Sequence, residues 1–176
     1  MYFWAQVVGF IAVFFYLLGY LQRKRGYILL FNLTSRVLYI LQYLMLGAFS
    51  GAVLDVAGAL STVFAQKKDA PWIKKHLGAV IIFVNVVIVA AGIYVMVISE
   101  DVFGFLPILG VMFHTNAFWI DDEKKIRRLS MIGSPFWLAY NFISSAYFSC
   151  VGDTLSMVSL GISMYRYDRK KSKGKD

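Results

Sequence analysis

Seven long stretches of this chain carry almost no charge, and short charged segments separate them. A helix needs roughly 20 apolar residues to cross the hydrocarbon of a membrane, and five of the stretches clearly reach that length. The third and the seventh are shorter and each has an aspartate near its start, so we expect their ends to be the least well defined. The stretches are residues 2–21, 27–48, 51–66, 77–98, 102–120, 129–149 and 150–165.

The composition requires lipid around these stretches. Hydrophobic residues make up 59% of the 176 residues and charged residues 16%, and the mean hydropathy is +0.64. Soluble domains have about 45–50% apolar and about 25% charged residues, and a chain this short has too little interior to hide the excess from water. Because lipid cannot satisfy backbone hydrogen-bonding groups, all seven stretches are predicted to be helices. The predicted fold is an all-α integral membrane protein with seven transmembrane helices.

The basic residues predict the orientation of these helices. Seventeen of the 18 Lys and Arg residues lie in segments that seven spans would place on one side, within residues 23–25, 67–75, 124–128 and 166–175. The opposite connections hold Glu100 and Asp101 and no Lys or Arg. By the positive-inside rule, the N-terminus is outside and the tail is cytoplasmic. The basic segments also suit anionic lipid, whereas the tail has too few stacking aromatics to indicate nucleic-acid binding.

Two stretches repeat one pattern of residues. "SRVLYILQYLMLGAFSGAVLD" begins at Ser35 and "SPFWLAYNFISSAYFSCVGDT" at Ser134, and a shift of 99 places Gln42 on Asn141. The first three and the last three helices are therefore predicted to be two parallel copies of a three-helix unit. A single linker helix restores the direction between them, as in transporters with parallel repeats. The predicted divisions are 1–69 for the first unit, 70–101 for the linker, 102–168 for the second unit and 169–176 for a basic tail.

Several short motifs carry a family resemblance that runs over nearly the full length. The segments "AQVVGFIAV", "YLMLGAFSGAVLD", "LPILG" and "SSAYFSCVGDTL" resemble the YgjV-type bacterial inner-membrane proteins. That group is in turn distantly similar to the SWEET and PQ-loop transporter superfamily. The resemblance implies a multi-pass protein of the bacterial inner membrane, with a three-plus-one-plus-three bundle and a solute pathway between its two triple-helix units. Gln6 and Pro107 would be split halves of the PQ signature.

Polar residues within the stretches are candidates for solute binding, because such groups are costly inside a membrane and usually mark a pathway or an interhelical contact. Gln42 and Asn141, facing each other across the pseudo-two-fold axis, could orient a hydroxylated or heterocyclic solute, or could simply hold helices together. Arg36 could bind a carboxylate or phosphate of the solute, or pair structurally with Asp55 or with helix ends. The aromatic residues expected to stack on the solute are Tyr39, Tyr43, Trp137 and Tyr140.

Other residues are candidates for coupling and movement. Asp55, Asp153 and His114 could carry protons or be structural. Where SWEET-like relatives hold sugar with an asparagine, the nearest residues in this chain are Asp55 and Asp153, which is a departure from the pattern of those relatives. Pro107 and Pro135 are candidate hinges. The single cysteine, Cys150, excludes an internal disulfide and a multi-cysteine metal site, and no metal or cofactor is predicted.

The predicted function is facilitated transport of a small polar solute, such as a sugar or a nucleoside-like or vitamin-like molecule, by alternating access. Membrane lipids and a second copy of the chain are the other expected partners. No catalytic motif is present, so an enzyme is not expected. Two alternatives stay open: a proton-coupled carrier of an amino acid or organic anion, and a non-transporting scaffold that holds a partner with its basic tail.

Overall fold

Helices account for nearly all of the chain in the computed structural model, which describes residues 1–21 and 25–168; the basic residues at 23–24 and in the tail 169–176 lie outside this range. No strand occurs among the described residues. The α-helices are α1 (Tyr2–Leu21), α2 (Arg25–Leu46), α3 (Phe49–Gln66), α4 (Pro71–Lys75), α5 (Leu77–Ile98), α6 (Phe105–Trp119), α7 (Glu123–Ile143) and α8 (Tyr147–Ser163). A 3₁₀ turn, η1 (Val102–Gly104), precedes α6, and a π-helical turn, η2 (Met164–Asp168), follows α8.

The prediction of an all-helical protein is confirmed, with differences at individual helix ends. Helices α1 and α5 have the predicted bounds, and α4 is a short helix that the apolar pattern did not predict. The stretch predicted at 129–149 is wrong at both ends, since α7 begins at Glu123 and stops at Ile143. Asp122 caps α7, its carboxylate accepting a hydrogen bond from the backbone N–H of Lys124 at 2.9 Å, so the helix extends into the charged connection.

Length and apolarity alone qualify three segments of the described chain as membrane-crossing: Phe49–Gln66, Leu77–Ile98 and Val102–Trp119. The apolar parts of α1 and α2 are shorter, Tyr2–Leu18 and Leu30–Leu46. Helix α7 begins with a charged segment, and α8 has only 17 residues. These features make the protein a helical one that can span a membrane, while the full set of seven spans stays a prediction.

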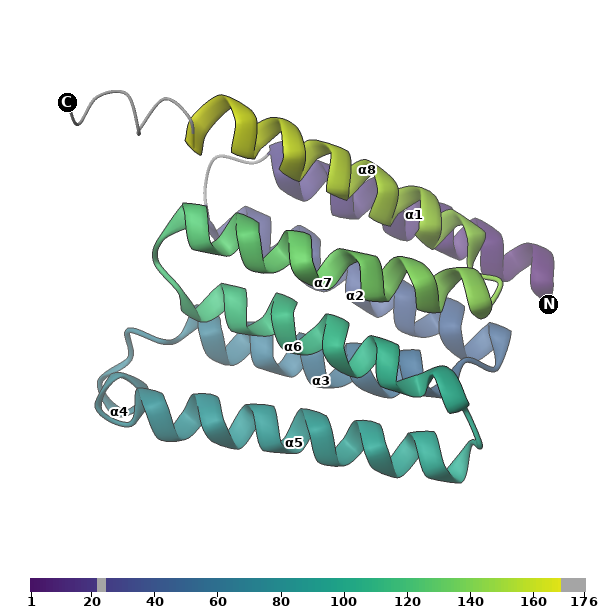
Figure 1. The fold of residues 1–176 in the computed structure, drawn as a ribbon, viewed down its shortest axis with the longest axis horizontal. Coiled ribbons are helices and arrows are strands. Elements are labelled where there is room, and N and C mark those ends of the chain that lie inside the picture. Colours follow the sequence, from purple (N-terminus) through teal and green to yellow (C-terminus); the bar gives the residue numbers. More distant parts are fainter. Residues whose placement is uncertain (22–24, 169–176) are drawn as a thin grey trace.

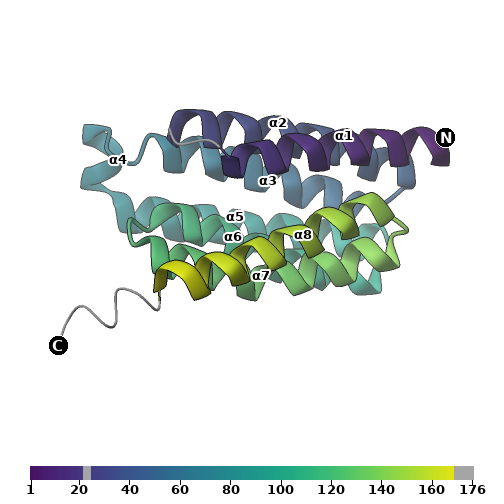
Figure 2. The ribbon, with the colours of Figure 1, turned by 90° about the horizontal axis from the view of Figure 1, so that it is seen from above.

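The long helices lie side by side in two layers. Helices α1, α2 and α3 form one layer, and α5, α6, α7 and α8 form the other (Figures 1 and 2). Within the layers α1 contacts α2, α2 contacts α3, α6 contacts α7 and α7 contacts α8. Within the second layer α5 also contacts α6. Between the layers α1 contacts α8, and α3 contacts both α5 and α6. The six helices α1–α3 and α6–α8 thus form a closed ring, with α5 outside it.

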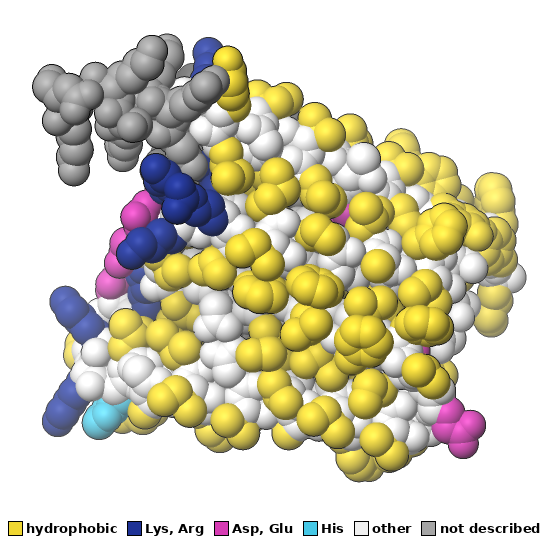
Figure 3. All heavy atoms as spheres, viewed as in Figure 1, with side chains coloured by type: hydrophobic (Ala, Val, Ile, Leu, Met, Phe, Trp, Pro, Cys, Tyr) yellow, Lys and Arg dark blue, Asp and Glu magenta, His cyan; other side chains and the backbone are white. Residues whose placement is uncertain are grey.

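The surface and the core divide as a bilayer requires. Apolar side chains cover the middle of the face in Figure 3, and Lys and Arg gather near the end where α5 begins. Helix α5 exposes Ile82, Phe83 and Tyr94. The apolar core lies where α2, α3, α5, α6 and α7 meet, and includes Tyr43, Leu54, Ile88, Val111 and Tyr140. An apolar middle with charged ends is the surface expected for a helical membrane protein.

The breaks between α2 and α3 and between α7 and α8 have the same geometry. Gly47 and Ser145, 98 positions apart, both have left-handed backbones, with φ of 74° and 59°. The N–H of Ala48 donates to the carbonyl of Tyr43 at 2.9 Å, and the N–H of Ala146 donates to that of Asn141 at 2.8 Å. Around the breaks the correspondence is therefore 98 positions, and the sequence register of 99 is wrong by one residue. Tyr43, not Gln42, corresponds to Asn141.

Candidate functional site

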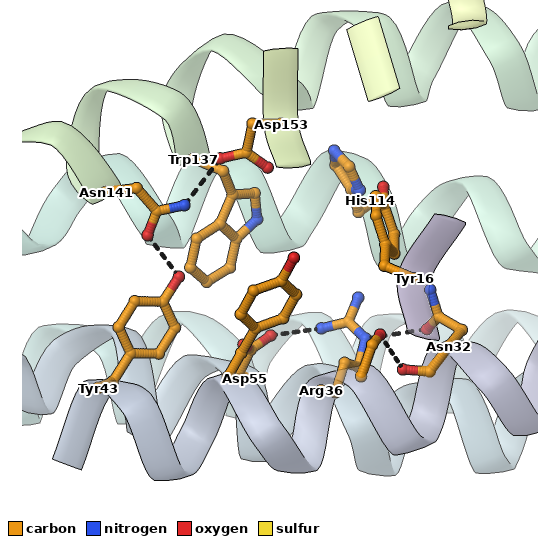
Figure 4. Close-up of a pocket in the computed structure, with 11 residues that line it drawn as sticks. Tyr16, Asn32, Arg36, Tyr43, Asp55, His114, Trp137, Asn141 and Asp153 are labelled. Atoms are coloured by element: carbon orange, nitrogen blue, oxygen red, sulfur yellow. Dashed lines mark hydrogen bonds and ion pairs between the residues drawn. The ribbon is translucent and has the colours of Figure 1, made fainter. Parts of the chain in front are cut away.

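A cavity of about 50 Å³ lies inside the ring of helices, between α2 on one side and α7 on the other (Figure 4). By this measure one water needs about 10–15 Å³, so the cavity holds a few waters and is too small for a sugar. All six ring helices contribute to its lining. The lining residues are Tyr16, Asn32, Ser35, Arg36, Tyr39, Tyr43, Asp55, His114, Trp137, Asn141 and Asp153.

A buried ion pair joins α2 to α3 beside the cavity. Arg36 Nη1 donates to Asp55 Oδ1 at 2.7 Å, and the two side chains are 8% and 6% exposed. Arg36 Nε also donates to Asn32 Oδ1 at 3.2 Å, one helical turn away. Gly58 leaves room for the guanidinium, because a Cβ there would collide with Arg36 Nη1. The structure thus pairs Arg36 with Asp55, one of the two roles that the sequence left open.

A chain of hydrogen bonds crosses the cavity from α2 to α8. The Tyr43 hydroxyl donates to Asn141 Oδ1 at 2.6 Å, and Asn141 Nδ2 donates to Asp153 Oδ2 at 2.7 Å. Both Tyr43 and Asn141 are 2% exposed. The Asn141 side chain accepts one hydrogen bond through Oδ1 and donates one through Nδ2. Tyr43 and Asp153 therefore set the orientation of the Asn141 amide.

Aromatic rings form part of the cavity wall. Tyr43 stacks on Trp137 with ring centroids 6.1 Å apart, and on Tyr39 at 6.5 Å. Gly110 lies against Trp137, where a Cβ would come within 2.6 Å of the indole. On the α6 side, the His114 ring lies 3.4 Å from the Ser134 hydroxyl. Three of the four aromatic residues predicted for solute stacking therefore line one cavity.

The structure separates the two carboxamides that the sequence placed opposite each other. Asn141 lines the cavity and Gln42 does not. Gln42 Oε1 accepts a hydrogen bond from the Ser149 hydroxyl at 2.6 Å, its Nε2 has no partner among the described residues, and Gly9 packs against its amide group. Gln42 is therefore part of the contact between α2 and α8, and the expectation of a facing Gln42–Asn141 pair is corrected.

Three further predicted residues also lie outside the lining. The Tyr140 hydroxyl accepts from the N–H of Gly51 at 3.0 Å and donates to Asp101 Oδ2 at 3.2 Å, near the end of α7. Pro107 is buried in the first turn of α6, and Pro135 is exposed within α7. Nothing in these positions tests a hinge role.

Asn32 lines the cavity and was not among the site residues predicted from the sequence. Its position four residues before Arg36 on one helical face is the signal that could have found it. Tyr16 and Ser35 also line the cavity and were not among the predicted site residues. Among the described residues, no group of three His, Cys, Asp or Glu side chains is arranged to hold a metal ion.

Comparison with known proteins gives one family. The model of the Imp-YgjV family, described as a bacterial inner membrane protein, matches residues 3–171. No curated protein and no solved structure matches the chain. The resemblance to YgjV-type proteins is therefore confirmed over nearly the whole sequence, and the likeness to SWEET and PQ-loop transporters stays a prediction.

Proposed function

The chain belongs to this family of bacterial inner membrane proteins, and on that premise we propose that it is a transporter that carries a small polar solute by alternating access without ATP. The observation that supports this most is the polar cavity at the centre of an apolar helical bundle. Charged and amide groups inside a membrane are costly to keep, and they usually mark a solute or proton pathway.

In the proposed arrangement, seven helices cross the membrane, and α1–α3 and α6–α8 are two equivalent units joined by α5. The helix contacts support it, since the pairs within the first unit have counterparts within the second, and the α3–α6 contact has its counterpart in α8–α1. Two hydrogen bonds also correspond at a shift of 98: Ser149 to Gln42, and Gly51 to Tyr140.

Alternating access requires contacts at the two ends that open in turn. At one end, Lys68 forms an ion pair with Asp121 and approaches the carbonyl of Trp119, which ties the connection after α3 to the end of α6 and the connection after it. At the other end, Tyr140 ties Gly51 of α3 to Asp101. Both sets of contacts are formed in the structure, and the cavity has room for only a few waters. Solute entry would break one set while the other holds.

We expect the Lys68 end to be cytoplasmic. Cys150→Ser removes the only cysteine. Glu100→Cys, in the connection after α5, or Lys125→Cys, in the first turn of α7, then adds one at an exposed position at one end of the bundle or the other. In intact spheroplasts, a membrane-impermeant maleimide should label Glu100→Cys at once and Lys125→Cys only after lysis. The Cys150→Ser parent is the unlabelled control. Labelling in the reverse order would contradict the proposed N-out, C-in topology.

Transport is tested by finding a solute and then removing a cavity group. The purified protein is heated with sugars, nucleosides, amino acids, amines and organic acids, and solutes that raise the melting temperature are assayed for uptake into proteoliposomes. Asn141→Leu removes an amide that lines the cavity, and uptake should fall by about tenfold, the equivalent of one hydrogen bond. Thr154→Val, one residue beyond Asp153 and exposed, is the matched control and should keep the wild-type rate.

A negative result in these two assays would count against transport. If no solute stabilises the protein, or if uptake is the same in Asn141→Leu and Thr154→Val, the cavity is not a transport site. The non-transporting scaffold would then be favoured.

A further inference from the structure

The cavity lining contains one arginine and two aspartates, so its formal charges do not sum to zero. Arg36 and Asp55 form an ion pair at 2.7 Å and neutralise each other. Asp153 is the third charged group in the lining, and no described Lys, Arg or His forms an ion pair with it. An ionised carboxylate in a membrane interior is unfavourable without a positive charge nearby. A positive charge placed at Asp153, which is partly buried, would remove this cost, and none of the lining side chains supplies it through an ion pair.

The partner of Asp153 among the described residues is neutral. Oδ2 accepts from the Asn141 amide at 2.7 Å, and the oxygen of that amide is already engaged by Tyr43. Oδ1 has no hydrogen bond to any described residue. Cys150 lies near Asp153 on α8 itself. The titratable or charged groups that face the same cavity are Tyr16 of α1, Arg36, Tyr39 and Tyr43 of α2, Asp55 of α3 and His114 of α6. The α7 lining, Trp137 and Asn141, carries no titratable group.

We propose that the cavity binds one positive charge at Asp153, either a proton or the ammonium group of a small amine. Tyr39, Tyr43 and Trp137 line the same cavity, and an aromatic face that is open to the cavity would attract a cation. Arg36 opposes a second cation only weakly because Asp55 holds and neutralises it. The volume of about 50 Å³ restricts the ligand to the size of a few waters. This assignment rests on the proposed transport function and deepens it by naming the charge that enters the pathway.

The experiment measures the melting temperature of the full chain in detergent. The wild type is compared at about pH 8 and about pH 5, where an aspartate in water stays ionised, and at about pH 8 with methylammonium chloride or equal sodium chloride. We expect the melting temperature of the wild type to rise by about 3 °C or more on acidification, on addition of methylammonium, or in both cases. Asp153→Asn should melt above the wild type at the alkaline pH and lose the response. Glu100→Gln, which neutralises an exposed carboxylate outside the cavity, should keep it.

The acidification and methylammonium measurements distinguish a bound proton from a bound ammonium group. A response to acid alone identifies a proton, and a response to methylammonium at alkaline pH identifies an ammonium group. An unchanged wild type, an equal response to sodium chloride, or a response that persists in Asp153→Asn overturns the proposal. Because the measurement does not require transport, cation binding without solute uptake would reject the transport function and leave this site standing.

Discussion

Replacing Arg36 by methionine is expected to lower the free energy of unfolding by about 3–5 kcal/mol, because it leaves the Asp55 carboxylate buried without its cation. The guanidinium and the carboxylate are 2.7 Å apart, and both side chains are more than nine-tenths buried. The low dielectric around them makes the unpaired carboxylate far more costly than the pair is favourable. Chemical unfolding in detergent, followed by circular dichroism, measures the loss.

A second substitution distinguishes charge from packing. The double variant Arg36→Met with Asp55→Leu replaces the pair by apolar groups, and it should recover most of the lost stability. Arg128→Met removes an exposed arginine from α7 and should change the stability by about 0.5 kcal/mol or less. If the double variant is as unstable as Arg36→Met, the loss comes from the shape of the arginine and the ion-pair explanation fails.

Replacing Trp137 by alanine is expected to lower the free energy of unfolding by about 2–4 kcal/mol. The indole is 7% exposed and stacks on Tyr43, and Gly110 allows α6 to approach it closely. In lipid the apolar transfer free energy contributes little, because the tails are as apolar as the core. The empty space left by the indole would instead leave the surrounding side chains without van der Waals partners. The same unfolding measurement applies.

Trp72→Ala provides the matched control for this substitution. Trp72 lies in α4 and is 67% exposed, so its loss should cost about 0.5 kcal/mol or less. Trp137→Phe keeps an aromatic ring against Tyr43, so its loss of unfolding free energy should lie between those of Trp137→Ala and Trp72→Ala. Equal costs for Trp137→Ala and Trp72→Ala would show that the ring beside the cavity is not packed as described.

The sequence alone predicted the helices well where an apolar stretch ends at a clear change of composition. Both ends of α1 and of α5 agree with the structure. The prediction was wrong at α7, where a capping aspartate extends the helix through charged residues and a left-handed Ser145 separates it from α8. Helix caps and backbone strain depend on a few local contacts, and hydropathy carries little information about them.

For the site, the sequence identified the residue types and the structure decided their partners. Arg36, Asp55, Asn141 and Asp153 could all be singled out as costly polar groups inside apolar stretches, and they share one cavity. The Arg36–Asp55 pair was one of two roles that the sequence left open, and the Tyr43–Asn141–Asp153 contacts were not predicted, because these residues lie on different helices. Contacts of this kind depend on how each helix is rotated about its own axis.

Gln42 shows how strongly the membership of the site depends on the rotation of a helix, since its side chain lies outside the cavity. The membrane class and the helical fold follow from the sequence by itself, because lipid penalises every charged or unpaired group wherever it lies along a span. The members of the site do not, because one residue of register turns a side chain by about 100° around a helix. The helix breaks correspond at 98 positions rather than 99, so Tyr43 faces the cavity and its neighbour Gln42 packs against α8.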